Sequence, residues 1–261
     1  MNKLSHIFVP NKKISKTTAS TLIAGQIIIC LLVWIYSPFV FLPTPAETLH
    51  SLHNLWERGF FYDMTASFTL NVEAILLSTV ISLFLAYSTV IAFFRPLVEF
   101  ICKLRFLSLV GLTFFFTLAT RNGHELKLSL LVFSITVFFV TSMADVLNAI
   151  PKVALDHART LRMGPWEIVW EVIILGQMDK VFDVVRQNAA ISWLMLTMVE
   201  GISRAGGGVG TLLLDSNKYF RLSDVMAIQL TILIVGLAQD YFIGYLKEFF
   251  CPYALITVER K

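Results

Sequence analysis

Polar side chains that could contact a solute or a proton are scattered through otherwise apolar stretches of this chain. They are Asn71, Glu73, Asp145, Asn148, Arg186, Gln187, Asn188, Ser192, Glu200, Gln229 and Asp240. Groups of this kind are costly in a membrane, so they face the protein interior or a water path. Asn188 and Ser192 lie four residues apart, which places them on one face of a helix. Most of the set is expected to be structural, and we predict that Asn188, Ser192 and Glu200 line a path through the membrane.

No grouping of these residues predicts an enzyme or a metal site. A nucleophile, a base and an orienting group do not come together in the sequence. His50 and His53 are three residues apart, but no Cys or carboxylate cluster completes a metal site, so an interfacial position is expected for both. The cysteines show neither a disulfide pattern nor a metal-binding spacing; they are Cys30, Cys102 and Cys251. We therefore expect no catalytic residue, no metal and no cofactor.

The Gly-rich run at 206–210 has the composition of a phosphate-binding loop without its chemistry. It lacks the Lys-Ser/Thr pair with which such loops hold phosphate and magnesium. We predict a flexible turn instead.

A polar segment at 156–166 separates two apolar stretches and carries several cations. Upstream of it, Pro151 can open a helix at its first position. Apolar residues then recur at spacings of three and four, which predicts one apolar helix face; they are Ala154, Leu155, Ala158 and Leu161. Gly164 is suited to the left-handed stop of that helix, and Pro165 to the first turn of the next. The segment is predicted to form two short helices with a sharp bend.

The composition places the chain in a bilayer. Of its 261 residues, 56% are apolar and only 15% are charged. A membrane span needs about 20 mostly apolar residues. Six segments qualify, and the fifth is the most polar; they are 21–42, 67–94, 101–120, 126–146, 181–202 and 225–250. The fold class predicted is an all-α, polytopic helical bundle with about six transmembrane helices.

Basic residues in short loops stay preferentially on the cytoplasmic side, and their distribution predicts that both termini are cytoplasmic. The predicted inner segments hold Lys3, Lys12, Lys13, Lys16, Arg95, Lys103, Arg105, Lys152, Arg159, Arg162, Lys180, Lys247, Arg260 and Lys261. The predicted outer segments hold Arg58, Arg121, Lys127, Arg204, Lys218 and Arg221. The segment at 156–166 is thereby placed inside and the Gly-rich turn outside.

This topology divides the chain into a cytoplasmic segment at 1–20, a membrane domain at 21–250 with its long inner connection at 151–180, and a cytoplasmic tail at 251–261. The first apolar run is longer than a signal-peptide core and no small-residue cleavage pattern follows Pro43, so a retained span is expected. Between the first two spans an interfacial helix is predicted. The net charge of +3 is small, and no nucleic acid is expected as a partner.

The same topology predicts which charges pair. Near the outer side, Glu200 is expected to pair with a basic residue such as Arg204. Near the inner side, Arg186 is expected to pair with Asp183 or Asp179.

Several motifs resemble the permeases of binding-protein-dependent ABC importers, closest to the nitrate, sulfonate and taurine branch. In that family Glu-Ala-Ala is followed by Gly and later by an aliphatic-Leu-Pro ending. The corresponding residues here are Asp156-His157-Ala158, Gly164 and Ile174-Leu175-Gly176. Further matches are Leu42-Pro43-Thr44-Pro45 with Glu47, the stretch from Arg186 through Trp193 to Glu200-Gly201, the run Gly207-Gly208-Val209-Gly210, and Asp224-Val225 with Asp240. Prolines usual in the branch are missing around 106–118.

The resemblance implies a type I ABC importer permease in a bacterial inner membrane, working by alternating access. Its expected partners are a second copy of the permease, two cytoplasmic ATP-binding subunits, an extracytoplasmic substrate-binding protein and membrane lipid. ATP hydrolysis is expected on a separate chain, and a small anion as the solute. The residues expected to receive the ATPase movement are Asp156, His157, Ala158, Arg159, Thr160, Leu161 and Gly164.

Three other interpretations fit the residues. The helix at 156–166 could lie on the headgroups, with its arginines attracted to anionic lipid. The chain could be a stand-alone ion-coupled carrier, although no internal repeat is found in it. It could also be a membrane-embedded enzyme acting on lipid.

Overall fold

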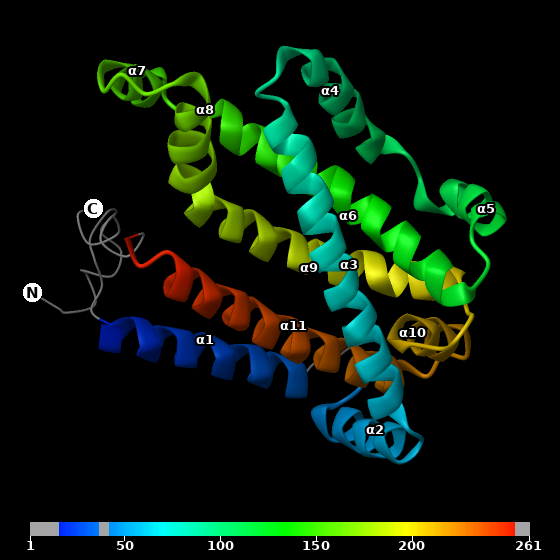
Figure 1. The fold of residues 1–261 in the computed structure, drawn as a ribbon. Coiled ribbons are helices and arrows are strands. Elements are labelled where there is room, and N and C mark those ends of the chain that lie inside the picture. Colours follow the sequence, from blue (N-terminus) through cyan, green and yellow to red (C-terminus); the bar gives the residue numbers. More distant parts are fainter. Residues whose placement is uncertain (1–15, 37–41, 254–261) are drawn as a thin grey trace, which may run out of the picture.

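The computed structural model describes residues 16–36 and 42–253 (Figure 1). These residues form helices and connecting turns, with no strand among them. The α-helices are α1 (Lys16–Ile35), α2 (Pro45–Glu57), α3 (Phe60–Ser88), α4 (Arg95–Lys103), α5 (Leu109–Ala119), α6 (Gly123–Asn148), α7 (Lys152–Thr160), α8 (Pro165–Ile168), α9 (Met178–Ile202), α10 (Val209–Lys218) and α11 (Leu222–Phe250). Short 3-10 helices flank α4, namely η1 (Ala92–Phe94) and η2 (Leu104–Phe106). The all-helical membrane class is confirmed.

Four of the described helices are long and apolar enough to cross a membrane: α1, α3, α6 and α11. The third predicted span, at 101–120, is not one helix. The chain from Ala92–Phe106 turns by 113° into Leu109–Ala119, and this bent pair counts as a fifth span if it crosses as a unit. The helix breaks at Leu107, whose backbone is extended with φ −75° and ψ 134°.

The fifth predicted span corresponds to α9, which is 25 residues long but is not among the helices apolar enough to qualify. It carries Asp179, Lys180, Asp183, Arg186 and Glu200. By length and composition, the described residues therefore hold four such spans, or five with the bent pair, where about six were predicted. Within the described chain, α9 packs against α3, α6, α10 and α11.

The core lies where α3, α6, α9 and α11 meet. Leu130, Leu131 and Ile135 of α6 are fully buried there with Leu196 of α9 and Ile228 of α11. The face of α3 that packs on α6 is rich in small residues, which let helix backbones approach closely; they are Ser67, Ala74, Ser78, Ser82 and Ala86. In contrast, none of the apolar window of α1 is buried, so this helix presents its apolar surface to lipid or to another chain.

The two ends of the bundle differ in what they carry. Figure 1 places α7 and α8 at the end where α1 begins and α11 ends, which we call the elbow end. At the opposite end lie α2 and α10, next to the Gly-rich turn, and we call it the Gly-turn end. The interfacial helix predicted between the first two spans is α2, which starts with a capping box: Glu47 N–H donates to the Thr44 hydroxyl, and Thr44 N–H to the Glu47 carboxylate.

Candidate functional sites

The polar segment predicted to bend does so between α6 and α9, and we call residues 151–177 the elbow segment. Its first helix, α7, begins at Lys152, with Pro151 as the N-cap residue rather than the first helical one. On its surface the Arg159 guanidinium pairs with the Asp156 carboxylate at 2.9 Å. The Thr160 hydroxyl donates to the carbonyl oxygen of His157 at 2.6 Å. The predicted helix exists, and α7 projects beyond the bundle in Figure 1.

The bend itself is made differently from the prediction. The residue in the left-handed conformation is Arg162, with φ 58°, whereas Gly164 has extended φ −66° and ψ 159°. Gly164 is the N-cap of α8, and its N–H donates to the Glu167 carboxylate at 2.7 Å. The expectation that Gly164 supplies a left-handed stop is wrong: the turn occurs two residues earlier, so Gly164 caps the second helix instead of closing the first.

After α8 the chain changes helix type twice before the long helix begins. A π-helix, η3 (Val169–Ile174), is followed by a 3-10 helix, η4 (Leu175–Gln177), and then by α9. Gly176 sits in this transition, and a Cβ there would meet the carbonyl oxygen of Glu171 at 3.1 Å. Stretches of π and 3-10 helix inside a helical run frequently mark hinges. The elbow segment therefore joins α9 through a deformable connection.

Three of the four residues of the apolar face predicted on α7 turn inward, but the fourth, Leu161, is exposed. Ala158 is only 3% exposed, and Ala154 and Leu155 are half-buried, because α7 packs on α8 and η3. Ala158, one of the residues expected to receive the ATPase movement, is thus buried against its own chain and presents no open surface to a partner. Large apolar side chains point outward instead; they are Val153, 77% exposed, Leu161, Trp166 and Trp170.

The candidate path residues lie in the interior of the single chain. Asn188 and Ser192 are both buried on α9, on one helix face as predicted. The Asn188 amide donates to the carbonyl oxygen of Val184 at 2.9 Å, and the Ser192 hydroxyl to that of Ala189 at 2.7 Å. The amide oxygen of Asn188 is buried without a hydrogen-bond partner. Their contact with a transported solute stays a prediction.

Glu200, the third candidate, belongs to a buried polar cluster at the Gly-turn end. Its side chain is 1% exposed and accepts hydrogen bonds from the Ser67 hydroxyl at 2.7 Å and from Gly210 N–H at 2.8 Å. The expected partner Arg204 pairs with Asp215 at 3.3 Å instead. That pairing prediction is wrong because α10 folds back over the end of α9, which brings Asp215 to Arg204 and the N-terminus of α10 to Glu200.

The Gly-rich turn is fastened to this cluster. The Lys127 ammonium donates to the carbonyl oxygen of Gly207 at 2.6 Å, Gly208 N–H donates to the Asp63 carboxylate at 3.2 Å, and Val209 N–H to the Ser67 hydroxyl at 2.9 Å. Gly206, Gly207 and Gly208 all have positive φ. The turn predicted to be flexible is held by side chains from α3, α6 and α9, so we correct it to an anchored turn. We call Asp63, Ser67, Lys127, Glu200 and this turn the Gly-turn cluster.

Asp63, Ser67 and Lys127 were not predicted as members of this cluster, and Lys127 was counted among the loop cations. It is 5% exposed and lies on the face of α6 that buries Leu130, Leu131 and Ser134. A lone lysine at that helical spacing from buried residues was the signal that could have found it.

Two ion pairs join α9 to α11. Nε and Nη2 of Arg186 donate to the two carboxylate oxygens of Asp240. The Lys247 ammonium pairs with the Asp183 carboxylate at 2.6 Å. The prediction that Arg186 pairs with Asp183 or Asp179 is therefore wrong. The prediction considered only acidic residues on α9 itself. The actual partner, Asp240, lies on α11 across the helix interface.

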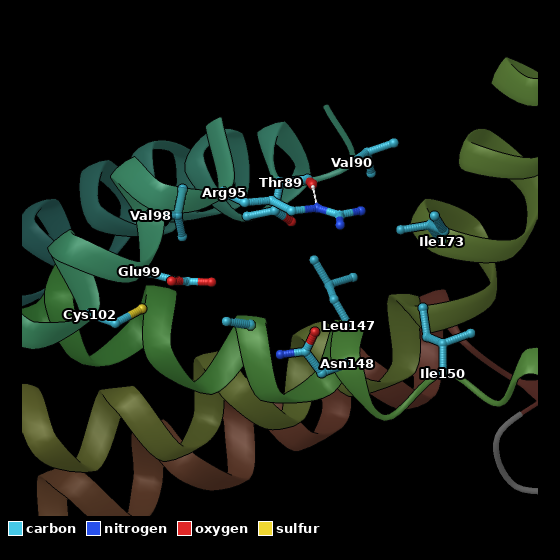
Figure 2. A pocket seen from close by; sticks show the side chains of 11 residues that line it. Thr89, Val90, Arg95, Val98, Glu99, Cys102, Leu147, Asn148, Ile150 and Ile173 are labelled. Atoms are coloured by element: carbon cyan, nitrogen blue, oxygen red, sulfur yellow. Dashed lines mark hydrogen bonds between the residues drawn. The ribbon is translucent and has the colours of Figure 1, made fainter. Parts of the chain in front are cut away.

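A cavity of about 440 Å³ opens beside the elbow segment, between α4, the end of α6 and η3 (Figure 2). Glu99 and Asn148 project into it, and Ile173 of η3 forms one side. Arg95 extends along its edge and donates from Nε to the carbonyl oxygen of Thr89 at 3.0 Å. Among the described residues, no group of three or more His, Cys, Asp or Glu side chains could hold a metal ion.

The chain is similar to a protein of known role over part of its length. It is 25% identical over 122 residues to the bicarbonate transport system permease protein CmpB of Synechococcus elongatus, and equally to that of Synechococcus sp.. The match covers 44% of this chain and 44% of each relative. No family model matches the chain. Together with the apolar helices, this distant similarity supports a multi-pass membrane protein of the transport-permease kind.

Proposed function

We propose that the chain is a permease subunit of an ATP-driven ABC importer, and that it receives the movement of a separate ATPase through its elbow segment. Residues 21–250 form the permease domain, with the coupling segment at 151–180, and residues 1–20 and 251–261 are its cytoplasmic flanks. The elbow end then faces the cytoplasm and the Gly-turn end faces outward. This orientation follows from the distribution of Lys and Arg.

The observation that carries the proposal is the exposure of large apolar side chains on a projecting, bent segment. Val153, Leu161, Trp166 and Trp170 are all exposed on this segment, which extends beyond the bundle. An amphipathic helix laid in a partner's groove passes a rigid-body movement across a subunit boundary. Around this surface, Asp156, His157, Arg159 and Thr160 are exposed and supply polar contacts.

The π and 3-10 turns at the end of the elbow segment suit this role. A push on α7 and α8 reaches α9 only through the π and 3-10 turns of η3 and η4. Because α9 packs on α3, α6 and α11, its tilt moves the wall of the bundle. Alternating access then follows from movement of α9 against its neighbours, with the solute path beside α9 and with Asn188, Ser192 and Glu200 near it.

We propose partners that match a permease which does not hydrolyse ATP itself. Two cytoplasmic ATP-binding subunits dock at the elbow ends of two permease copies, and an extracytoplasmic binding protein docks at the Gly-turn end. A small anion is proposed as the solute. The permease named for bicarbonate among the relatives and the resemblance to the nitrate, sulfonate and taurine branch both support this class.

The test is crosslinking from the exposed surface of the elbow segment. A photoreactive amino acid replaces Leu161 in the full chain, expressed in its native membrane, and the adducts are identified by mass spectrometry. We expect a cytoplasmic ATP-binding subunit as the adduct. A matched probe at Tyr219, exposed at the Gly-turn end, is expected not to capture it. Adducts of Leu161 restricted to lipid support the headgroup interpretation instead, and adducts with an extracytoplasmic protein overturn the proposed orientation.

A further inference from the structure

An ion pair lies on the surface of the membrane helices, where lipid would be its neighbour. The side chains of Arg186 and Asp240 are 46% and 35% exposed. Asp240 is ten residues from the end of α11, or about 15 Å along the helix axis at 1.5 Å per residue. We take α11 to extend equally beyond both faces of a hydrocarbon core about 30 Å thick. The Asp240 carboxylate then lies about 8 Å inside the core face nearest the elbow end.

This pair is part of a polar seam that starts at the elbow end. The Asp183–Lys247 pair is closest to that end, and Arg186–Asp240 follows about one turn further along α9 and about two turns further along α11. Gln187 is exposed beside Arg186 on α9. We call the surface formed by Asp183, Arg186, Gln187, Asp240 and Lys247 the α9–α11 seam.

Beyond the ion pair, the seam continues as a groove between the two helices. It encloses about 290 Å³ and is lined by Arg186 and Asp240, by the small residues Ala189, Ala190 and Gly236, and by Trp193. The charged pair thus stands at the end of a groove whose other walls are apolar and whose helices approach closely.

Charged groups at this depth pair with one another and face a bundle interior or a water-filled cavity, because lipid does not solvate them. The interior of this chain is already occupied there: Asn188 and Ser192 face inward and are buried, whereas Arg186 and Gln187 face outward. The outward face of α9 must therefore meet water or a second protein chain.

We propose that the α9–α11 seam lines the elbow-end half of the solute path, and that the Arg186–Asp240 pair is its charged constriction. This inference rests on the proposed function and places the wall of the path on residues other than the predicted Asn188 and Ser192, which support it from behind. A guanidinium fork that holds a carboxylate through two oxygens also fits a small oxyanion with the same oxygen spacing. The solute would replace the Asp240 carboxylate at Arg186 as the constriction opens.

Water access is tested by cysteine labelling in the full complex. Cys30, Cys102 and Cys251 are first replaced, and single cysteines are then placed at Ala190 and Gly236 in the groove and at Val80, an exposed position on α3. A charged, membrane-impermeant thiol reagent is added to each side of the membrane in turn. We expect labelling of Ala190→Cys and Gly236→Cys and none of Val80→Cys. Groove cysteines that stay unlabelled from both sides of the membrane would show a dry interface with the second copy and overturn the inference.

Uptake kinetics test the role of the pair itself. Labelled bicarbonate, nitrate and taurine are offered to proteoliposomes containing the whole complex. Because Lys lacks the planar fork, Arg186→Lys is expected to raise the KM for the transported anion about tenfold. Asp240→Asn removes the competing carboxylate and is expected to lower the KM. A merely structural pair would leave the KM unchanged in both variants and reduce only the amount of folded complex.

Failure of this inference is distinguishable from failure of the proposed function. A wild-type complex that takes up solute without ATP overturns the proposed function. ATP-driven uptake by the wild type, combined with unlabelled groove cysteines or an unchanged KM in both variants, overturns the path assignment alone.

Discussion

The Lys127 ammonium donates a hydrogen bond to the carbonyl oxygen of Gly207 at 2.6 Å and so joins the start of α6 to the Gly-rich turn across 80 residues of chain. Glu200 accepts from Ser67 and Gly210 in the same cluster, and Lys127 is electrostatically coupled to it. A turn with three consecutive positive-φ glycines would be mobile on its own. These contacts hold it against three helices.

The buried lysine is expected to stabilise this end of the bundle. Lys127→Met removes the hydrogen bond that the ammonium donates to the Gly207 carbonyl oxygen, and a hydrogen bond from a charged group is worth about 1.5 to 3 kcal/mol. We expect a clearly lower melting temperature for the detergent-purified protein. Lys103→Met, at an exposed lysine of α4, is the control and is expected to leave it unchanged. Equal shifts in the two variants would contradict the role of the cluster.

Alanine substitutions at two glycines of the turn distinguish the cost of backbone strain from the cost of a steric clash. Gly206 and Gly208 have φ of +79° and +116°, but a Cβ at Gly206 meets nothing within 4 Å, whereas one at Gly208 lies 2.4 Å from Oε1 of Glu200. Gly206→Ala should cost only backbone strain, about 1 to 3 kcal/mol. Gly208→Ala should cost more, since it also displaces the carboxylate. Thermal unfolding of both variants in detergent measures the difference, and indistinguishable melting temperatures would show that the Glu200 contact is unimportant.

Gln239 links three helices through one amide oxygen. It accepts from the Trp193 indole N–H at 2.8 Å and from the Asn71 amide at 3.2 Å. Gln239→Leu leaves both donors unpaired, and a buried polar group left without its partner costs about 1 to 3 kcal/mol. The double variant Asn71→Leu with Gln239→Leu removes one of these donors and should regain part of the lost thermal stability. A double variant whose loss equals the sum of the two single losses would argue against the coupling.

At Gly164, in the bend of the elbow segment, the size of a substituted side chain should affect uptake more than the loss of glycine's backbone freedom. Gly164 has an extended backbone that any residue adopts, and a Cβ there makes only ordinary contact with Glu167 at 3.6 Å. We expect Gly164→Ala to retain uptake. Gly164→Trp should lose most of it while the amount of protein in the membrane stays constant, because the bulky ring blocks docking of the bend. Parallel loss of uptake and of membrane protein would indicate misfolding and contradict this expectation.

The sequence was sufficient for features that depend on neighbouring residues. The apolar helices α3, α6 and α11, the short helices of the elbow segment and the helix α2 all follow from local periodicity and capping. The break at Leu107 did not, because an apolar run looks the same whether it is straight or bent.

Pairings between distant residues could not be predicted in the same way. Arg186 was matched to its neighbours on α9, but its partner Asp240 comes from α11. Glu200 was matched to Arg204, whereas α10 folds back and supplies Gly210 N–H. Such contacts depend on which helices pack together. The periodicity of a helix shows which of its residues share a face, but not which other helix packs against that face.

ATP-driven uptake tests the central claim most directly. The chain is reconstituted into proteoliposomes with and without the ATP-binding subunits that copurify with it, and the accumulation of labelled bicarbonate, nitrate and taurine delivered by the copurifying binding protein is followed. We predict accumulation of at least one anion only when both the ATP-binding subunits and ATP are present. Accumulation by the chain alone, driven by an ion gradient without ATP, would identify a stand-alone carrier and contradict this account.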